Sequence, residues 1–321
     1  MGAIRFDDVS KEFPGMRQRA VDHCSLEVTD GEFVVLLGPS GCGKTTLMKM
    51  VNRLYEPTSG TITLDGKDVQ QMNGTDLRRR IGYVIQQIGL FPHMTVAQNI
   101  SVVPRLLGWD SARIHKRVDE LLALVDLQPA EYRHRYPAQL SGGQQQRVGV
   151  ARALAGDPTL ILMDEPFGAV DAITRGSLQE EMLRLQRQLH KTVLFVTHDV
   201  DEALRLADRI VIMQAGKVIQ YASPLEILGN PANQFVKQLM GGDDILRQLS
   251  LVRIEAAMQR VHPSSQNHGQ VTIDQGCSLR DALSLLLRGD TNRLVVTEDG
   301  KQTGQLTLED IRTHAESTGK N

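Results

Sequence analysis

The chain has 321 residues and a mass of 35.6 kDa, longer than one usual domain, which favours a large domain with a smaller appendage. Apolar residues make up 41% of the sequence and charged residues 23%, a globular balance that excludes fibrous and disordered classes. The net charge of −2 and the pI near 6.5 give no electrostatic reason to expect nucleic acid as a partner.

The hydropathy pattern indicates a chain that stays in the cytosol. We find no run of about 18 apolar residues, and residues 1–11 carry charges where a signal peptide needs an apolar stretch. The three cysteines, Cys24, Cys42 and Cys277, are widely spaced and lack the spacing of metal ligands. We therefore expect reduced thiols and no metal bound through sulfur.

Short apolar runs alternate with helical stretches over much of the chain. Residues 32–37 predict a buried strand, and residues 45–51 predict a helix that follows a glycine-rich loop. Further buried strands are predicted over residues 161–163, 193–196 and 210–213. Because strands and helices alternate, we expect a parallel sheet with helices on its faces.

The strand signals stop between about residues 97 and 157, where we expect an inserted helical subdomain. Apolar residues recur there at helical spacing, namely Ile114, Val118, Leu121, Leu122 and Val125.

The pattern changes again after Ala222. Asn230 and Pro231 mark a turn, and Gly241 begins a glycine pair that is typical of a joint. We place the end of the large domain near Gly241, and expect a linker over residues 241–252 and a small α+β segment over residues 253–321.

The loop between the first predicted strand and helix fits the phosphate-binding pattern G-x-x-x-x-G-K-[ST]. Its residues are Gly38, Pro39, Ser40, Gly41, Cys42, Gly43, Lys44 and Thr45. Its backbone N–H groups would converge on phosphates, helped by the dipole of the helix that follows. We expect Lys44 to reach the β- and γ-phosphates of a nucleotide, Thr45 to bind Mg²⁺, and Thr46 to complete the site. The alternative is a chance glycine turn.

Two carboxylates, Asp164 and Glu165, follow the strand predicted over residues 161–163. This is the edge at which an open parallel sheet places its ligands. Asp164 would hold Mg²⁺, and Glu165 could polarise an attacking water, because phosphoryl transfer depends mainly on positioning and charge stabilisation. The alternative is a solvated strand end with ordinary acids.

A second predicted anion site follows Leu140 and consists of Ser141, Gly142, Gly143 and Gln144. Ser141 is a natural N-cap for a helix that we expect to end near Ala155. One domain cannot easily direct two anion sites at the same phosphate, so the second site indicates completion by another copy.

With this L-S-G-G-Q sequence complete, the chain resembles the ATP-binding cassette (ABC) family over about residues 4–240. The resemblance implies an α/β fold, a P-loop NTPase cassette with a mixed, largely parallel sheet and a helical subdomain. It also implies ATP and Mg²⁺ as cofactors. Two copies would form a head-to-tail dimer, in which the signature of each closes over the P-loop of the other.

The resemblance assigns roles to four further residues. Phe13 matches the aromatic residue that stacks on adenine, although core packing is the alternative. Gln86 matches the glutamine that senses Mg²⁺ and the membrane partner, with Gln87 as an alternative register. His198 matches the histidine that contacts the γ-phosphate, where a structural histidine is the alternative. Asp171 matches the loop at which two cassettes meet.

The sequence around residues 83–100 looks most like that of bacterial importers of glycine betaine and related osmoprotectants. The resemblance implies an ATPase bound to transmembrane permease subunits at the cytoplasmic face of the bacterial inner membrane. A solute-binding protein would act through the permease. Alternatives are an importer of an amino acid or polyamine, an exporter, a catalytically silent ATP binder, or a soluble ABC protein of DNA repair or translation.

The carboxy-terminal segment, roughly residues 253–313, resembles a single motif of the cystathionine β-synthase (CBS) type. Predicted elements are a capped helix over residues 278–287, a strand over 293–297 and a turn over 298–300. Thr307 and Asp310 match a T-x-x-D pattern that contacts adenosine in nucleotide-binding members of that family. We hypothesise a regulatory adenine nucleotide there. The alternative is that Thr307 caps a helix beginning near Leu308.

Overall fold

The computed structural model describes residues 2–85, 89–168, 172–241, 245–260, 271–288 and 291–318. Its internal contacts divide the chain into two compact units, Met1–Ala222 and Ser223–Asn321. The division falls earlier than Gly241, since α9 (Pro224–Gly229) contacts both α10 (Gln234–Met240) and α11 (Ile245–Leu251).

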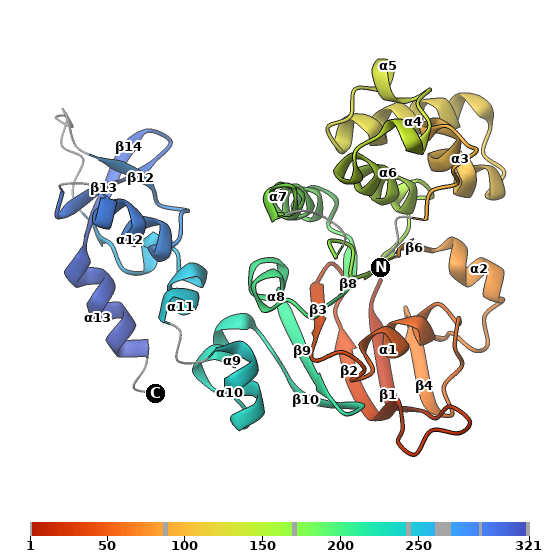
Figure 1. The fold of residues 1–321 in the computed structure, drawn as a ribbon, viewed down its shortest axis with the longest axis horizontal. Helices are drawn as coiled ribbons and strands as arrows, with labels where there is room; N and C mark the ends of the chain where they lie inside the picture. Colours follow the sequence, from red (N-terminus) through yellow and green to blue (C-terminus); the bar gives the residue numbers. More distant parts are fainter. Residues whose placement is uncertain are drawn as a thin grey trace. The chain divides into compact units, whose positions relative to one another are not determined.

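A six-stranded sheet in the order β10-β9-β3-β8-β7-β6 forms the centre of the first unit (Figure 1). Its strands are β3 (Phe33–Leu37), β6 (Ile81–Val84), β7 (Leu160–Asp164), β8 (Thr192–Thr197), β9 (Arg209–Gln214) and β10 (Lys217–Ala222). All neighbours pair in parallel except β10, which pairs antiparallel with β9. Every residue of β3, β7 and β8 is buried, as their apolar sequences require. The predicted mixed, largely parallel sheet is thus confirmed.

A second, antiparallel sheet in the order β2-β1-β4-β5 was not expected from the sequence. Its strands are β1 (Ile4–Lys11), β2 (Val21–Val28), β4 (Ser59–Leu64) and β5 (Lys67–Asp68). Alternate residues of β2 point into a core that α1 (Lys44–Val51) also enters. The P-loop therefore lies where the two sheets and α1 meet.

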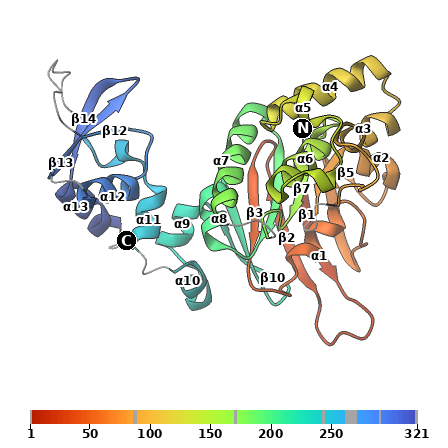
Figure 2. The same cartoon turned by 45° about the horizontal axis from the view of Figure 1, so that its top comes forward.

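Helices replace strands between residues 96 and 154, as predicted. They are α3 (Val96–Leu106), α4 (Ser111–Leu124), α5 (Pro129–Tyr132), a 3-10 turn (Pro137–Gln139) and α6 (Gly142–Leu154). They form one group beside the sheet, in which α3, α4 and α6 contact one another (Figure 2). Thr95 caps α3 and Asp110 caps α4.

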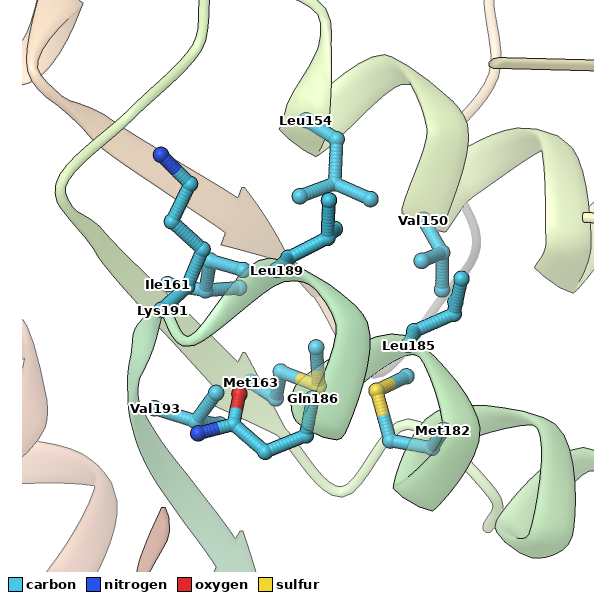
Figure 3. Close-up of a pocket in the computed structure, with 10 residues that line it drawn as sticks. All are labelled: Val150, Leu154, Ile161, Met163, Met182, Leu185, Gln186, Leu189, Lys191 and Val193. Atoms are coloured by element: carbon cyan, nitrogen blue, oxygen red, sulfur yellow. The ribbon is translucent and has the colours of Figure 1, made fainter. Parts of the chain in front are cut away.

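Helix α7 (Ala172–Leu189) packs its apolar side chains on β7, β8 and α6. Figure 3 shows the small cavity left between them, which measures about 10 Å³ and is too small for any ligand larger than a water. Its lining includes Leu154 from α6, Met182 and Leu185 from α7, and Met163 and Val193 from the sheet. Two other helices, α2 (Gly74–Arg79) and α8 (Val200–Leu206), complete the first unit.

The second unit is a small α+β fold. Its sheet has the order β11-β14-β13-β12, with β11 (Gln259–Arg260), β12 (Thr272–Asp274), β13 (Arg293–Glu298) and β14 (Lys301–Thr307). The remaining elements are a 3-10 turn (Ile254–Ala256), α12 (Leu279–Arg288) and α13 (Leu308–Thr318). The predicted turn between β13 and β14 is confirmed, with positive φ at Asp299 and Gly300. Nowhere in the described ranges is a helix long and apolar enough to cross a bilayer.

Candidate functional site

The predicted phosphate-binding loop connects β3 to α1, as its sequence context requires. Gly43 has a φ of 109°, and a Cβ there would lie 2.2 Å from the carbonyl oxygen of Ala20, so only glycine fits. Lys44 folds back over the loop, and its Nζ donates hydrogen bonds to the carbonyl oxygens of Gly38 at 2.7 Å and Pro39 at 3.0 Å. The ammonium group is therefore held within the concavity of the loop.

Cys42 lies on the inner side of this loop rather than on its surface. Its side chain is buried, and its Sγ lies 3.8 Å from Lys44 Nζ. Burial raises the pKa of the Cys42 thiol, while the nearby ammonium of Lys44 opposes the rise. The thiol is thus kept protonated near neutral pH.

The two predicted carboxylates stand at the carboxyl end of β7, next to the P-loop. Thr45 Oγ1 donates a hydrogen bond to Asp164 Oδ1 at 2.9 Å. Asp164 is buried, and this burial raises its pKa despite the hydrogen bond from Thr45. A desolvated carboxylate and a hydroxyl, both oxygen donors, suit a hard divalent cation such as Mg²⁺.

Glu165 and His198 form a pair beside the P-loop. His198 Nδ1 lies 3.3 Å from Glu165 Oε1, and the Glu165 N–H donates to the carbonyl of Val196 at 3.0 Å. These contacts join the end of β7 to the end of β8. Glu165 adopts a φ of 45°, a left-handed conformation that is uncommon for a residue with a side chain.

An open cleft of about 730 Å³ brings most of the predicted nucleotide site together. Its lining includes Phe13, Ser40, Gly41, Gly43, Lys44, Thr45, Thr46 and Glu165. Phe13 is half-buried, meets Tyr55 in an edge-to-face contact with ring centroids 5.2 Å apart, and has Lys11 Nζ 5.1 Å from its ring centroid. Phe13 thus lies at the cleft rather than in the core.

The signature residues fold as predicted but do not line this cleft. Ser141 caps α6, accepting a hydrogen bond from the Gln144 N–H, while Gln144 Oε1 accepts one from the Ser141 N–H. Gly142 and Gly143 form the first turn of α6, whose N-terminus is open to an anion.

The remaining predicted residues lie elsewhere. Gln86 and Asp171 are outside the described residues. Thr307 and Asp310 belong to the second unit, where Asp310 Oδ2 accepts from both the N–H and the hydroxyl of Thr307, at 2.8 and 2.6 Å. This is the arrangement of a cap on α13, as the alternative reading expected.

Sequence reasoning missed several residues near the site. Arg17 and Arg19 line the cleft beyond Phe13, and the Arg19 guanidinium pairs with Glu12 and Asp22. Arg175 pairs with Asp199, the residue after His198. The only local signal for Arg17 and Arg19 was their spacing of two residues. The contact of Arg175 with Asp199 joins residues from α7 and the cap of α8, which no local sequence pattern indicates.

Comparisons with known proteins agree with this geometry. The ABC transporter family model matches residues 21–168, and the CBS domain model matches residues 267–317. The chain is 51% identical to the glycine betaine/carnitine/choline transport ATP-binding protein of Bacillus subtilis, over 92% of this chain and 75% of that protein. It is 49% identical to the glycine betaine uptake system ATP-binding protein of Escherichia coli K12, over 97% of this chain and all of that protein.

A solved structure shares the fold of the first unit. It is the dimeric, post-hydrolysis state of an ATP-binding cassette bound to ADP and Pi, with a TM-score of 0.61 and 32% identity, covering 69% of this chain and 98% of that one. The cleft, the capped signature helix and the relatives at about 50% identity over nearly the whole chain lead to one conclusion. The chain belongs to the ABC transporter family, as one of its ATP-binding subunits.

Proposed function

We propose that the chain is the ATP-hydrolysing subunit of an importer of glycine betaine, choline, carnitine or a similar quaternary amine. The observation that carries the catalytic part is the Glu165–His198 pair at the edge of the P-loop cleft. The names of the relatives in Bacillus subtilis and Escherichia coli support the choice of solute.

Each residue of the cleft has its own role in binding or hydrolysing ATP. Lys44 stabilises charge on the β- and γ-phosphates, and Phe13 stacks on the base. Thr45 and Asp164, with Gln86 by resemblance, would hold Mg²⁺, which neutralises phosphate charge when bound. Glu165 accepts a proton from the attacking water, and His198 fixes the position of Glu165 and contacts the γ-phosphate.

We further propose that two copies act together, head to tail. The signature on α6, at Ser141 to Gln144, does not line the cleft of its own chain, so it would close over the P-loop of the second copy. Asp171 would lie where the copies meet. The dimer would bind permease subunits at the cytoplasmic face of the inner membrane, with the solute delivered by a binding protein.

Uptake of labelled glycine betaine tests this function directly. Cells would produce the wild-type or the Glu165→Gln subunit together with its neighbouring transport genes, with choline and carnitine as competitors. Glutamine keeps the shape of Glu165 but cannot accept the proton. We expect uptake and ATPase activity from the wild type only.

The outcomes separate the parts of the proposal. ATPase activity that depends on Glu165, without betaine uptake, would keep the ATPase and reject the solute, directing the search to amino acids or polyamines. A wild-type subunit without ATPase activity when assembled with its permease would reject the whole function.

A further inference from the structure

The loop that carries His198 is held from both sides by carboxylates. Before it, the Thr197 hydroxyl donates a hydrogen bond to Glu202 Oε2 at 2.6 Å. After it, Asp199 caps α8, accepting from the N–H groups of Asp201 and Glu202 at 2.8 and 3.2 Å. The Asp199 N–H also donates to Thr197 Oγ1 at 3.0 Å, which closes the turn around His198.

Both carboxylates turn toward one cation, Arg175. Arg175 NH1 lies 3.5 Å from Asp199 Oδ2, and Arg175 Nε lies 3.9 Å from Glu202 Oε1. Arg175 is on the first turn of α7, a helix packed on the sheet, whereas Asp199 is the N-cap of α8 and Glu202 lies within α8. The guanidinium therefore ties the His198 loop to a different element of the fold.

The positive charge of Arg175 matters to the His198 loop because one of its two carboxylate partners, Glu202, is buried. The Glu202 side chain is only 7% exposed, so its negative charge needs compensation that solvent does not supply. Asp199 adds a second negative charge next to it. Without Arg175, the two carboxylates would repel each other across the turn that carries His198.

His198 depends on this support because packing does not fix it. Its side chain is 60% exposed and reaches Glu165 at 3.3 Å. The backbone sets the direction of the Cα–Cβ bond of His198, so the anchors at Thr197 and Asp199 hold this residue where one of its rotamers meets Glu165. An error of about 1 Å at a reacting centre can lower a rate by about a hundredfold.

We propose that Arg175 is a positioning residue for ATP hydrolysis, holding residues 197–199 so that His198 lies against Glu165. The proposal rests on the proposed ATPase function. Arg175 touches neither nucleotide nor water in this role. Its removal should therefore lower kcat and leave nucleotide binding unchanged.

The test compares ATPase kinetics of the assembled transporter carrying wild-type, Arg175→Met, Arg175→Lys or Asp199→Asn subunits. Arg187→Met is the matched control, since Arg187 lies on the last turn of the same helix. Asp199→Asn keeps an acceptor oxygen for the α8 cap and removes only the charge that faces Arg175. We expect kcat to fall about tenfold or more in Arg175→Met, with KM for ATP within about twofold of the wild type.

The other variants discriminate between positioning and general destabilisation. Arg175→Lys should have a higher kcat than Arg175→Met. The double variant Arg175→Met/Asp199→Asn should lose less kcat than the product of the fold-losses of the two single variants. Thermal unfolding of each variant is measured alongside. If Arg175→Met is unfolded, the kcat of Asp199→Asn tests the proposal instead, because this variant retains the cap of α8 and is expected to fold.

A kcat within about twofold of the wild type in Asp199→Asn and in any folded Arg175→Met would overturn the proposal. So would an equal loss in Arg187→Met, or a rise in KM that accounts for the whole effect. If the wild type itself shows no activity that Glu165→Gln abolishes, the proposed function fails instead, and the two failures are distinct.

Discussion

Thr45 and Asp164 are joined by a hydrogen bond of 2.9 Å, although they belong to α1 and β7 and lie far apart in the sequence. The hydroxyl donates to a carboxylate that burial has deprived of water, which raises the pKa of Asp164. The hydrogen bond holds the two oxygen donors side by side, and a cation bound there would compensate the charge on Asp164.

Replacing Asp164 with asparagine should separate cation binding from folding. The amide oxygen can still accept from Thr45, but the charge is gone. We expect the Mg²⁺ concentration for half-maximal ATPase activity to rise at least about tenfold, while the unfolding temperature stays equal or rises because no buried charge remains. Activity titrated against Mg²⁺ checks this, with exposed Asp76→Asn as the control. An unchanged Mg²⁺ requirement would contradict the assignment.

Glu181 on α7 should make stability depend on pH. Its side chain is buried against Arg147 on α6 at 3.0 Å, yet burial raises its pKa to about 7, above the usual 4.5. Between these values the folded chain binds more protons than the unfolded chain, so stability falls as pH rises from 4.5 to 7 and stays level above.

We therefore expect Glu181→Gln to be more stable than the wild type by about 1 to 3 kcal/mol at pH 8, with the difference shrinking toward pH 5. Urea unfolding across this range measures it. Glu180→Gln, a neighbouring exposed acid, should follow the wild type. Parallel curves for Glu181→Gln and wild type would show that Glu181 is not the titrating group.

Cys42 should make the ATPase sensitive to thiol reagents, but slowly. The thiol is buried and its pKa is raised by that burial, so little thiolate is present at pH 7. We expect N-ethylmaleimide to inhibit by adding bulk within the P-loop, at a rate that rises roughly tenfold per pH unit between 7 and 8. Cys42→Ser should be resistant, and inhibition that persists in this variant would assign the effect to another cysteine.

Thr307 should contribute to the stability of the second unit through its cap on α13. The Asp310 N–H donates to Thr307 Oγ1 at 3.3 Å, and Gln259 donates to the other oxygen of Asp310 at 2.7 Å. Thr307→Val keeps the shape and should lower the free energy of unfolding by about 1 kcal/mol. Calorimetric titration with AMP or a cyclic dinucleotide tests the regulatory hypothesis. A binding heat that is present in the wild type and absent in Thr307→Val would support the regulatory hypothesis. Equal heats in the two proteins would mean that Thr307 acts only as the cap of α13.

The parts of the fold that could be predicted from the sequence are those indicated by short, local sequence patterns. The strand predicted over residues 32–37 is found at Phe33–Leu37, and the helix predicted over residues 45–51 is found at Lys44–Val51, because both are indicated by local sequence patterns. Ser141 was predicted as a cap because serine is a favoured N-cap residue and precedes a helical run, and the structure shows a capping box with Gln144. By contrast, β1 was missed because irregularities between Phe6 and Val9 break the alternation of buried and exposed residues.

The same distinction holds for the site. The P-loop and the acid pair are consecutive residues, so their chemistry is visible in the sequence. Arg175 and Asp199 are 24 residues apart and meet only because α7 and α8 pack together. Phe13 was matched to a stacking residue only through the family resemblance, with core packing as the alternative, and the structure puts it in the wall of the P-loop cleft.

The backbone at Glu165 has a consequence for the history of such a site. A φ of 45° costs a residue with a Cβ about 1 kcal/mol relative to glycine. Selection for stability alone would therefore favour Glu165→Gly, which relaxes the turn and deletes the carboxylate. Under the proposed role of Glu165 as general base, a chain that no longer needed to hydrolyse ATP should drift toward glycine or asparagine at this position.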